Sequence, residues 1–123
     1  MTVRLLGGYI YNGDAYTYVA AQNSTTITAP ATNPRIDRIV IDASTGAVGV
    51  ITGSENVSPS APALTADKIP VAQVLLATDS TTITNSMITD ERHLNAATFS
   101  PFALKLDISP TQLSANTDNW SPT

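Results

Sequence analysis

The strongest pattern of apolar and polar residues lies in the middle of the chain, where residues 35–42 read RIDRIVID. Polar and apolar residues alternate at first, and the run then becomes apolar at three consecutive positions. Such a run is typical of a central strand that is covered on both faces. A Ser-Thr-Gly turn follows, and residues 47–52 then read AVGVIT, so residues 35–52 predict an antiparallel hairpin.

A tyrosine-rich pair of strands precedes this hairpin. Residues 3–11 have strand character, and a Gly-Gly pair at 7–8 predicts a bulge or a close backbone approach inside the strand. The Asn-Gly dipeptide at 12–13 is typical of a two-residue hairpin turn, because type I′ turns need positive φ at both central positions. Residues 15–20 form the predicted return strand, with tyrosines at alternate positions.

A proline-rich segment separates the central hairpin from the next long strand. Residues 53–66 hold Pro59 and Pro62 among Ser and Ala, which predicts an extended crossing over the surface. Pro70 is then expected to start a largely apolar strand over residues 71–78, since proline is tolerated at a strand's first position. Shorter strands are predicted at residues 25–28, 81–84, 87–89 and 103–108.

Together these elements predict an all-β protein with a single sandwich-like or small barrel-like domain of antiparallel hairpins. We place the β-rich domain at residues 1–93. Residues 94–123 are polar and bounded by prolines, which indicates a linker, an exchange arm or the start of a following β module. The extended arms at both ends are expected to be ordered only by neighbouring chains.

Composition and charge exclude several classes of function. Only 13% of the 123 residues are charged, and six Lys and Arg against ten Asp and Glu cannot form the basic stripe that nucleic acids require. No apolar run approaches the roughly 20 residues that span a bilayer, so membrane insertion is not expected. The absence of cysteine excludes disulfides, thiolate metal sites and thiol nucleophiles.

The only dense charge cluster reads DERH at residues 90–93. A metal site would need a second histidine or several converging carboxylates, and a catalytic triad would need an activated nucleophile. His93 is the only histidine, and no nucleophile motif accompanies it. We therefore expect no metal, no cofactor and no catalytic residue, and we assign the cluster a structural role.

In that role Asp90 or Arg92 holds the end of the strand predicted at residues 87–89 in place. Arg92 is expected to do so by pairing with Asp37 or Asp42 in bidentate geometry. The charged residues at the start of the central strand are expected on a solvated or interface face: Arg35, Asp37 and Arg38.

Five aromatic residues are candidates for contacts with other molecules. Tyr9, Tyr11, Tyr16 and Tyr18 cluster around the first predicted hairpin. Cross-strand tyrosines can stack on sugars, but they more often pack a two-stranded ribbon against a partner, and we favour packing or an interface. Trp120 is the single tryptophan and lies in the polar C-terminal stretch, which indicates docking on another surface.

The segments also follow a specific order along residues 7–93. The pattern consists of Gly8 with the tyrosine hairpin, Pro34-Arg35-Ile36-Asp37, Gly53 with Pro59 and Pro62, Val71-Ala72, and Ile83-Thr84 with Ile88, Asp90 and Arg92. In this order the chain resembles a module that recurs in tailed-bacteriophage structural proteins. It departs from that module at Val71, where the family pattern has leucine.

This resemblance implies a virion component, assembled in the host cytoplasm, whose N-terminal domain attaches a tail fibre, baseplate or head fibre to the particle. It implies a homotrimer that contacts other virion proteins of the baseplate, tail, neck or capsid, and a host-surface glycan is a further partner to consider. The rival hypothesis is a carbohydrate-binding module that uses the surface tyrosines. An enzyme would need His93 or Asp90 in a deep pocket.

Overall fold

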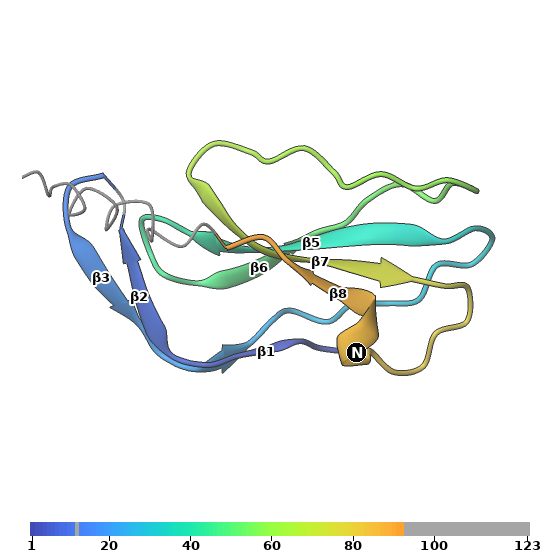
Figure 1. The fold of residues 1–123 in the computed structure, drawn as a ribbon, viewed down its shortest axis with the longest axis horizontal. Coiled ribbons are helices and arrows are strands. Elements are labelled where there is room, and N and C mark those ends of the chain that lie inside the picture. The colour runs from blue at the N-terminus through green and yellow to red at the C-terminus, as the bar shows by residue number, and fades with distance from the viewer. Residues whose placement is uncertain (12, 93–123) are drawn as a thin grey trace, which may run out of the picture. The chain divides into compact units, whose positions relative to one another are not determined.

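The computed structural model describes residues 1–11 and 13–92, and its regular structure is almost entirely β (Figure 1). The two longest strands, β5 (Arg35–Asp42) and β7 (Lys68–Leu76), pair antiparallel at the centre of a four-stranded sheet. The edges of this sheet are β6 (Val48–Ile51) and β8 (Ile88–Asp90), in the order β6-β5-β7-β8. The predicted all-β class is confirmed, and the described sheet is open rather than a closed barrel.

A bent ribbon from the N-terminal part of the chain packs on one face of the sheet. Its strands form two short pairs, β1 (Arg4–Leu5) with β4 (Gln22–Asn23) and β2 (Gly8–Tyr11) with β3 (Tyr16–Val19). The predicted strand over residues 3–11 is thus interrupted between β1 and β2.

The N-terminus itself is held within the same chain. The Met1 ammonium donates to the Ile27 carbonyl at 2.8 Å, and the Ile27 amide donates to the Met1 carbonyl at 2.7 Å. The expectation of an N-terminal arm ordered only by neighbouring chains is therefore wrong. The predicted C-terminal arm lies outside the described residues.

The hydrophobic core lies between the sheet and the N-terminal ribbon. Ile39, Val74 and Leu76 are fully buried, and burial of an aliphatic side chain of this size stabilises a fold by roughly 1.5–3 kcal/mol. Val40 points to the opposite face of β5 and is also buried, so the apolar run does belong to a central strand covered on both faces. The core cluster comprises Val19, Ile27, Ile39, Ile41, Val48, Ala72, Val74 and Leu76.

Pro70 lies inside β7 rather than at its start. The register of β5 against β7 shifts where Ile39 pairs with Ala72 but Val40 pairs with Pro70, which leaves Val71 as an extra residue. A bulge of this kind tolerates proline, because the ladder is already disrupted there and no proline N–H is needed. The strand therefore begins two residues earlier than predicted.

Other local predictions also differ from the structure. Tyr11 pairs with Tyr16, so four residues rather than two separate the last paired positions of the first hairpin; Asn12 of the predicted turn lies outside the described residues. Residues 25–28 and 81–84 are not strands. The first of these segments directs its Thr28 carbonyl to the Arg35 guanidinium at 2.7 Å instead of into a ladder.

The described residues form one compact unit, Met1–Arg92. No helix within them is both long and apolar enough to cross a membrane. The predicted strand at 103–108 lies beyond the described residues.

Candidate functional site

The charged residues at the start of β5 form a buried ion pair. Arg35 and Asp37 are two residues apart on one strand, so their side chains point to the same face. The guanidinium donates to both carboxylate oxygens, at 2.7 Å and 2.9 Å, and only 9% and 1% of the two side chains are exposed. The expectation that Arg35 and Asp37 lie on a solvated or interface face is therefore wrong.

This ion pair joins three segments of the chain. Arg35 Nη2 also donates to the Thr28 carbonyl at 2.7 Å, and Asp37 Oδ1 accepts a hydrogen bond from the Gly53 amide at 3.0 Å. The segment that contains Thr28, β5 and the start of the proline-rich crossing thus meet at this ion pair. Both carboxylate oxygens of Asp37 and the Nε and Nη2 atoms of Arg35 have hydrogen-bond partners, and such pairing offsets the cost of burying charge.

A second ion pair lies on the opposite face of β5. Arg38 donates to both carboxylate oxygens of Glu91 at 2.9 Å, and Gln73 Nε2 donates to the same carboxylate at 2.9 Å. The Pro62 carbonyl accepts a further hydrogen bond from Arg38 Nη1. The Arg38–Glu91 pair therefore connects the central strand to the crossing segment through Pro62 and to β7 through Gln73.

The expected partner of Arg92 is wrong. Arg92 pairs with Asp90, its Nε donating to Oδ1 at 2.9 Å, and both side chains are more than half exposed. Asp37 belongs to Arg35, and Asp42 accepts from the Lys68 ammonium at 2.6 Å. Asp90 and Arg92 meet locally because residues two apart in an extended segment share a face. That spacing was visible in the sequence.

Three carboxyl groups are held in their charged form. The Lys68 ammonium, assisted by the Ser44 hydroxyl and two backbone amides, holds the pKa of Asp42 far below its usual range. The Arg92 guanidinium lowers the pKa of Asp90 to about 2. The backbone amides of residues 33 and 32, at 2.9 Å and 2.6 Å, lower the pKa of Glu55.

These pKa shifts predict loss of stability in acid. A carboxyl group with a lowered pKa in the folded state stabilises the fold at pH values above its unfolded pKa. That contribution disappears as the pH falls through the folded pKa. We therefore expect a constant melting temperature from about pH 7 to pH 5 and a decline between about pH 4 and pH 2.

Calorimetry across this range checks the prediction, with Asp42→Asn as the matched variant. Its melting temperature should depend less steeply on pH than that of the parent chain. A parent melting temperature that stays constant to about pH 2, or that rises on acidification, would contradict the assignment.

The four tyrosines of the first hairpin form one exposed face. Tyr9 lies directly opposite Tyr18 and Tyr11 opposite Tyr16, so all four side chains project from the same side of the β2–β3 ribbon. Their exposed fractions are 72% for Tyr9, 48% for Tyr11, 68% for Tyr16 and 60% for Tyr18. We call these four residues the tyrosine face.

The other side of the ribbon anchors the tyrosine face to the domain. Val19 is part of the buried core, and Ile10 packs against that core. Gly7 makes room for a tyrosine, because a Cβ at this position would lie 2.6 Å from the Tyr18 hydroxyl oxygen. The close approach at Gly7 is thus chiefly to a side chain, with the Val19 carbonyl oxygen at 3.3 Å from the same Cβ position, and Gly7 lies between β1 and β2 rather than inside a strand.

The tyrosine rings do not lie in one plane. The centroids of Tyr9 and Tyr18 are 5.3 Å apart with an interplanar angle of 63°, and those of Tyr11 and Tyr16 are 4.9 Å apart at 43°. In the first pair the edge of one ring meets the face of the other. Such a surface is corrugated, whereas a platform that stacks several sugar rings in a row needs coplanar faces.

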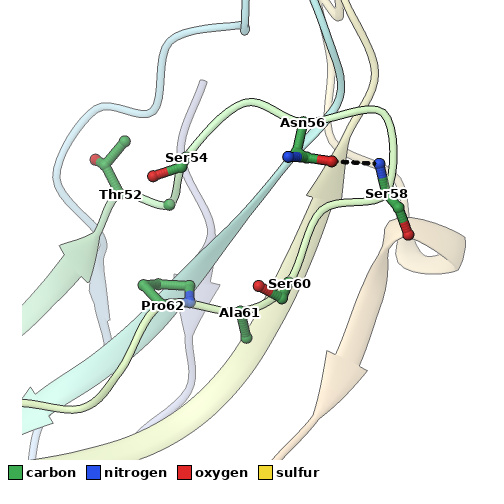
Figure 2. Close-up of a pocket in the computed structure, with 8 residues that line it drawn as sticks. Thr52, Ser54, Asn56, Ser58, Ser60, Ala61 and Pro62 are labelled. Atoms are coloured by element: carbon green, nitrogen blue, oxygen red, sulfur yellow. Dashed lines mark hydrogen bonds between the residues drawn. The ribbon is translucent and has the colours of Figure 1, made fainter.

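Two of the hollows in the described part of the chain lie beside the proline-rich crossing. The first, of about 200 Å³, lies within the proline-rich crossing and is lined by hydroxyl, amide and small side chains (Figure 2). Asn56 Oδ1 accepts a hydrogen bond from the Ser58 amide there, at 2.9 Å. The second, of about 480 Å³, is an apolar groove lined by Pro34, Val57, Pro59, Leu75, Ala77, Ser80 and Met87.

Some predicted site residues cannot be placed. His93 and Trp120 lie outside the described residues. Among residues 1–11 and 13–92, no three His, Cys, Asp or Glu side chains come together in a way that could hold a metal ion.

The sequence reasoning missed two structural partners. The sequence places Glu91 in a charge cluster and indicates no partner for it on β5, and it shows Gly53 only as part of a proline-containing pattern. A Cβ at Gly53 would lie 2.1 Å from the Ile36 carbonyl oxygen, so this position requires glycine. No periodicity in the sequence signals such a backbone approach.

No protein-family model, curated protein or solved structure matches this chain.

Proposed function

We propose that this chain is a non-enzymatic structural protein of a bacteriophage virion. It is the attachment and assembly domain of a tail-fibre, baseplate or head-fibre appendage and acts as a homo-oligomer. The order of segments along residues 7–93 supports the virion assignment through its resemblance to phage structural proteins. The observation that carries the assembly role is the tyrosine face.

The tyrosine face has the chemistry of a protein contact surface. A tyrosine buries roughly 150–250 Å² when it is covered, and its ring orders at low cost in conformational entropy. Four such side chains, each about half exposed or more, provide a substantial area from a short ribbon. Because the opposite side of the ribbon is fixed in the core, this area is presented in a preorganised form.

The charged side chains support a structural role as well. Two ion pairs join segments that are distant in the chain, Arg38–Glu91 and Lys68–Asp42, and the Arg35–Asp37 pair does so through Thr28 and Gly53. These charged side chains stabilise the domain itself. Contacts with a neighbouring chain are then made by the aromatic side chains and the Ser/Thr-rich surface.

The combined Tyr9→Ser and Tyr18→Ser variant tests the assembly role. We expect each substitution to weaken association by about 2 kcal/mol, the scale of an aromatic hot spot, so the oligomer should dissociate at concentrations where the parent chain stays assembled. Light scattering coupled to size exclusion measures the change.

Thr17→Ala is the matched control, because Thr17 is exposed on the same strand but points to the other side of the ribbon. An unchanged molar mass for the tyrosine variant would remove the tyrosine face from the proposal.

The second candidate function is carbohydrate binding, and the exposure of the four rings favours it. It predicts that the monomeric chain binds glycans and that Tyr11→Ala or Tyr18→Ala abolishes this binding. The tilt between paired rings favours protein contact instead, because it breaks up the flat platform. A glycan panel probed with the monomer distinguishes the two functions.

A further inference from the structure

One edge of the four-stranded sheet is open. The strand β6 pairs with β5 on one side only. The Asp42 amide donates to the Ala47 carbonyl at 2.9 Å, which fixes the alternation of hydrogen-bonded pairs along the ladder. By this alternation, the backbone groups of Val48, Val50 and Thr52 point away from β5.

The centre of this edge has unpaired backbone groups. The Val48 amide donates to Gln22 Oε1 at 3.2 Å, so the N-terminal ribbon covers the start of β6. Within residues 1–11 and 13–92, neither the amide nor the carbonyl of Val50 has a hydrogen-bond partner. An unpaired row of this kind is a template for another strand.

The two edges of the sheet differ in how they are protected. Proteins usually guard an edge strand with charges, proline, a bulge or a very short length. The β8 edge has three strand residues, and Asp90, Glu91 and Arg92 follow one another at its end. The β6 edge lies within residues 43–54, which contain neither a charged residue nor a proline.

We propose that β6 is a self-association edge, where β6 of one copy pairs antiparallel with β6 of a second copy. The proposal rests on the proposed function, in which the chain is a homo-oligomer. The second copy is the occupant because the strand is self-complementary. With a two-fold axis at Val50, the two Val50 residues exchange their amide and carbonyl bonds, and this contact uses the groups of Val50 because the Val48 amide already donates to Gln22 Oε1.

The side chains at this edge suit the same pairing. Val50 lies opposite Ile39 in the ladder and packs against the core, so two copies place their Val50 side chains next to each other on the core side. Neither strand brings a charge to the contact. The product is a continuous sheet across two domains.

This contact fixes the parity of the assembly. A strand that pairs with its own copy across a two-fold axis makes an isologous contact, which joins chains two by two. The assembly therefore contains an even number of chains. If a homotrimer forms through another surface, the β6 contacts join two such trimers into a hexamer.

The Val50→Lys variant of the full chain tests the edge by disruption. Two ammonium groups would then face each other directly at the axis, where like charges are unfavourable. We expect the dissociation constant of the oligomer to rise at least about tenfold in sedimentation. Thr89→Lys is the matched control, because it adds the same charge on the opposite edge strand, where Thr89 is exposed.

The Val50→Cys variant tests the same contact without added charge. Opposed residues of a hydrogen-bonded pair have Cα atoms about 5.5 Å apart, within the range that a disulfide spans. The chain has no cysteine of its own, so mild oxidation should convert most of this variant into a covalent dimer. Thr89→Cys should give little dimer under the same conditions.

The outcomes separate this inference from the proposed function. A monomeric parent chain overturns both. An oligomer that survives Val50→Lys, forms no Val50→Cys dimer or holds an odd number of chains overturns the β6 contact alone. If Val50→Lys fails to fold, as its thermal melt would show, the two cysteine variants decide the question. A covalent dimer of Val50→Cys without one of Thr89→Cys supports the contact. Equal amounts of dimer from the two variants, or no dimer from either, overturn it.

Discussion

Replacing Asp37 by alanine is expected to lower the free energy of unfolding by about 3–5 kcal/mol, because it leaves the Arg35 guanidinium buried without its counter-charge. A domain of this size has only about 5–15 kcal/mol in total, so much of the stability depends on one carboxylate. The same substitution also removes the acceptor of the Gly53 amide at the exit of β6. Chemical denaturation followed by circular dichroism measures the loss.

The matched control is Asp90→Ala, which removes a carboxylate from an exposed pair with the same two-residue spacing. Its denaturation midpoint should fall by much less than that of Asp37→Ala, because exposed ion pairs contribute little. Equal effects of the two substitutions would show that burial of the Arg35–Asp37 pair does not determine its importance.

Gly53→Ala should destabilise the domain by about 3 kcal/mol, because the added methyl group has no room. The new Cβ would lie 2.1 Å from the Ile36 carbonyl oxygen and 3.4 Å from Pro62 Cδ. The backbone must shift to relieve the first contact, and the shift also pulls the Gly53 amide away from Asp37. Thermal and urea unfolding measure the change.

Gly8→Ala is the control for this prediction, since a Cβ at Gly8 meets no atom within 4 Å. The double variant Asp37→Ala with Gly53→Ala should lose less stability than the two single losses together, because both act on one hydrogen bond. Strict additivity would mean that the two residues stabilise the exit of β6 independently.

The central strand and the shared face of the tyrosines could be predicted from the sequence. The apolar run in β5 indicated burial on both faces, and Ile39 and Val40 are both buried. The alternation of tyrosines along residues 9–18 indicated a shared face, and the register places Tyr9 opposite Tyr18. Both predictions rest on the period of two in a strand, which any β-structure imposes.

The burial of Arg35 and Asp37 could not be predicted from alternation alone. Polar residues at alternate positions usually mark a solvated face. Arg35 and Asp37 can be buried only because the guanidinium of one donates hydrogen bonds to the carboxylate of the other. The bulge at Pro70 was missed for a related reason. Register is set between strands, and one sequence does not show which residue of β7 is the extra one.

Weak strands were over-predicted. Residues 25–28 and 81–84 are rich in β-branched side chains, but propensity for strands is decided largely by neighbours. In the first segment, the Ile27 amide donates to Met1 and the Thr28 carbonyl accepts from Arg35. The second segment leads into a 3₁₀ turn at Asn85–Met87. Neither forms a ladder with a β-strand.

Native mass spectrometry of the unmodified full chain, over a range of concentrations, tests most directly whether this protein works through contacts between its own copies. We predict complexes of an even number of identical chains that dissociate on dilution and carry no bound small molecule. A single chain at every concentration, with glycan retained on it, would contradict the account.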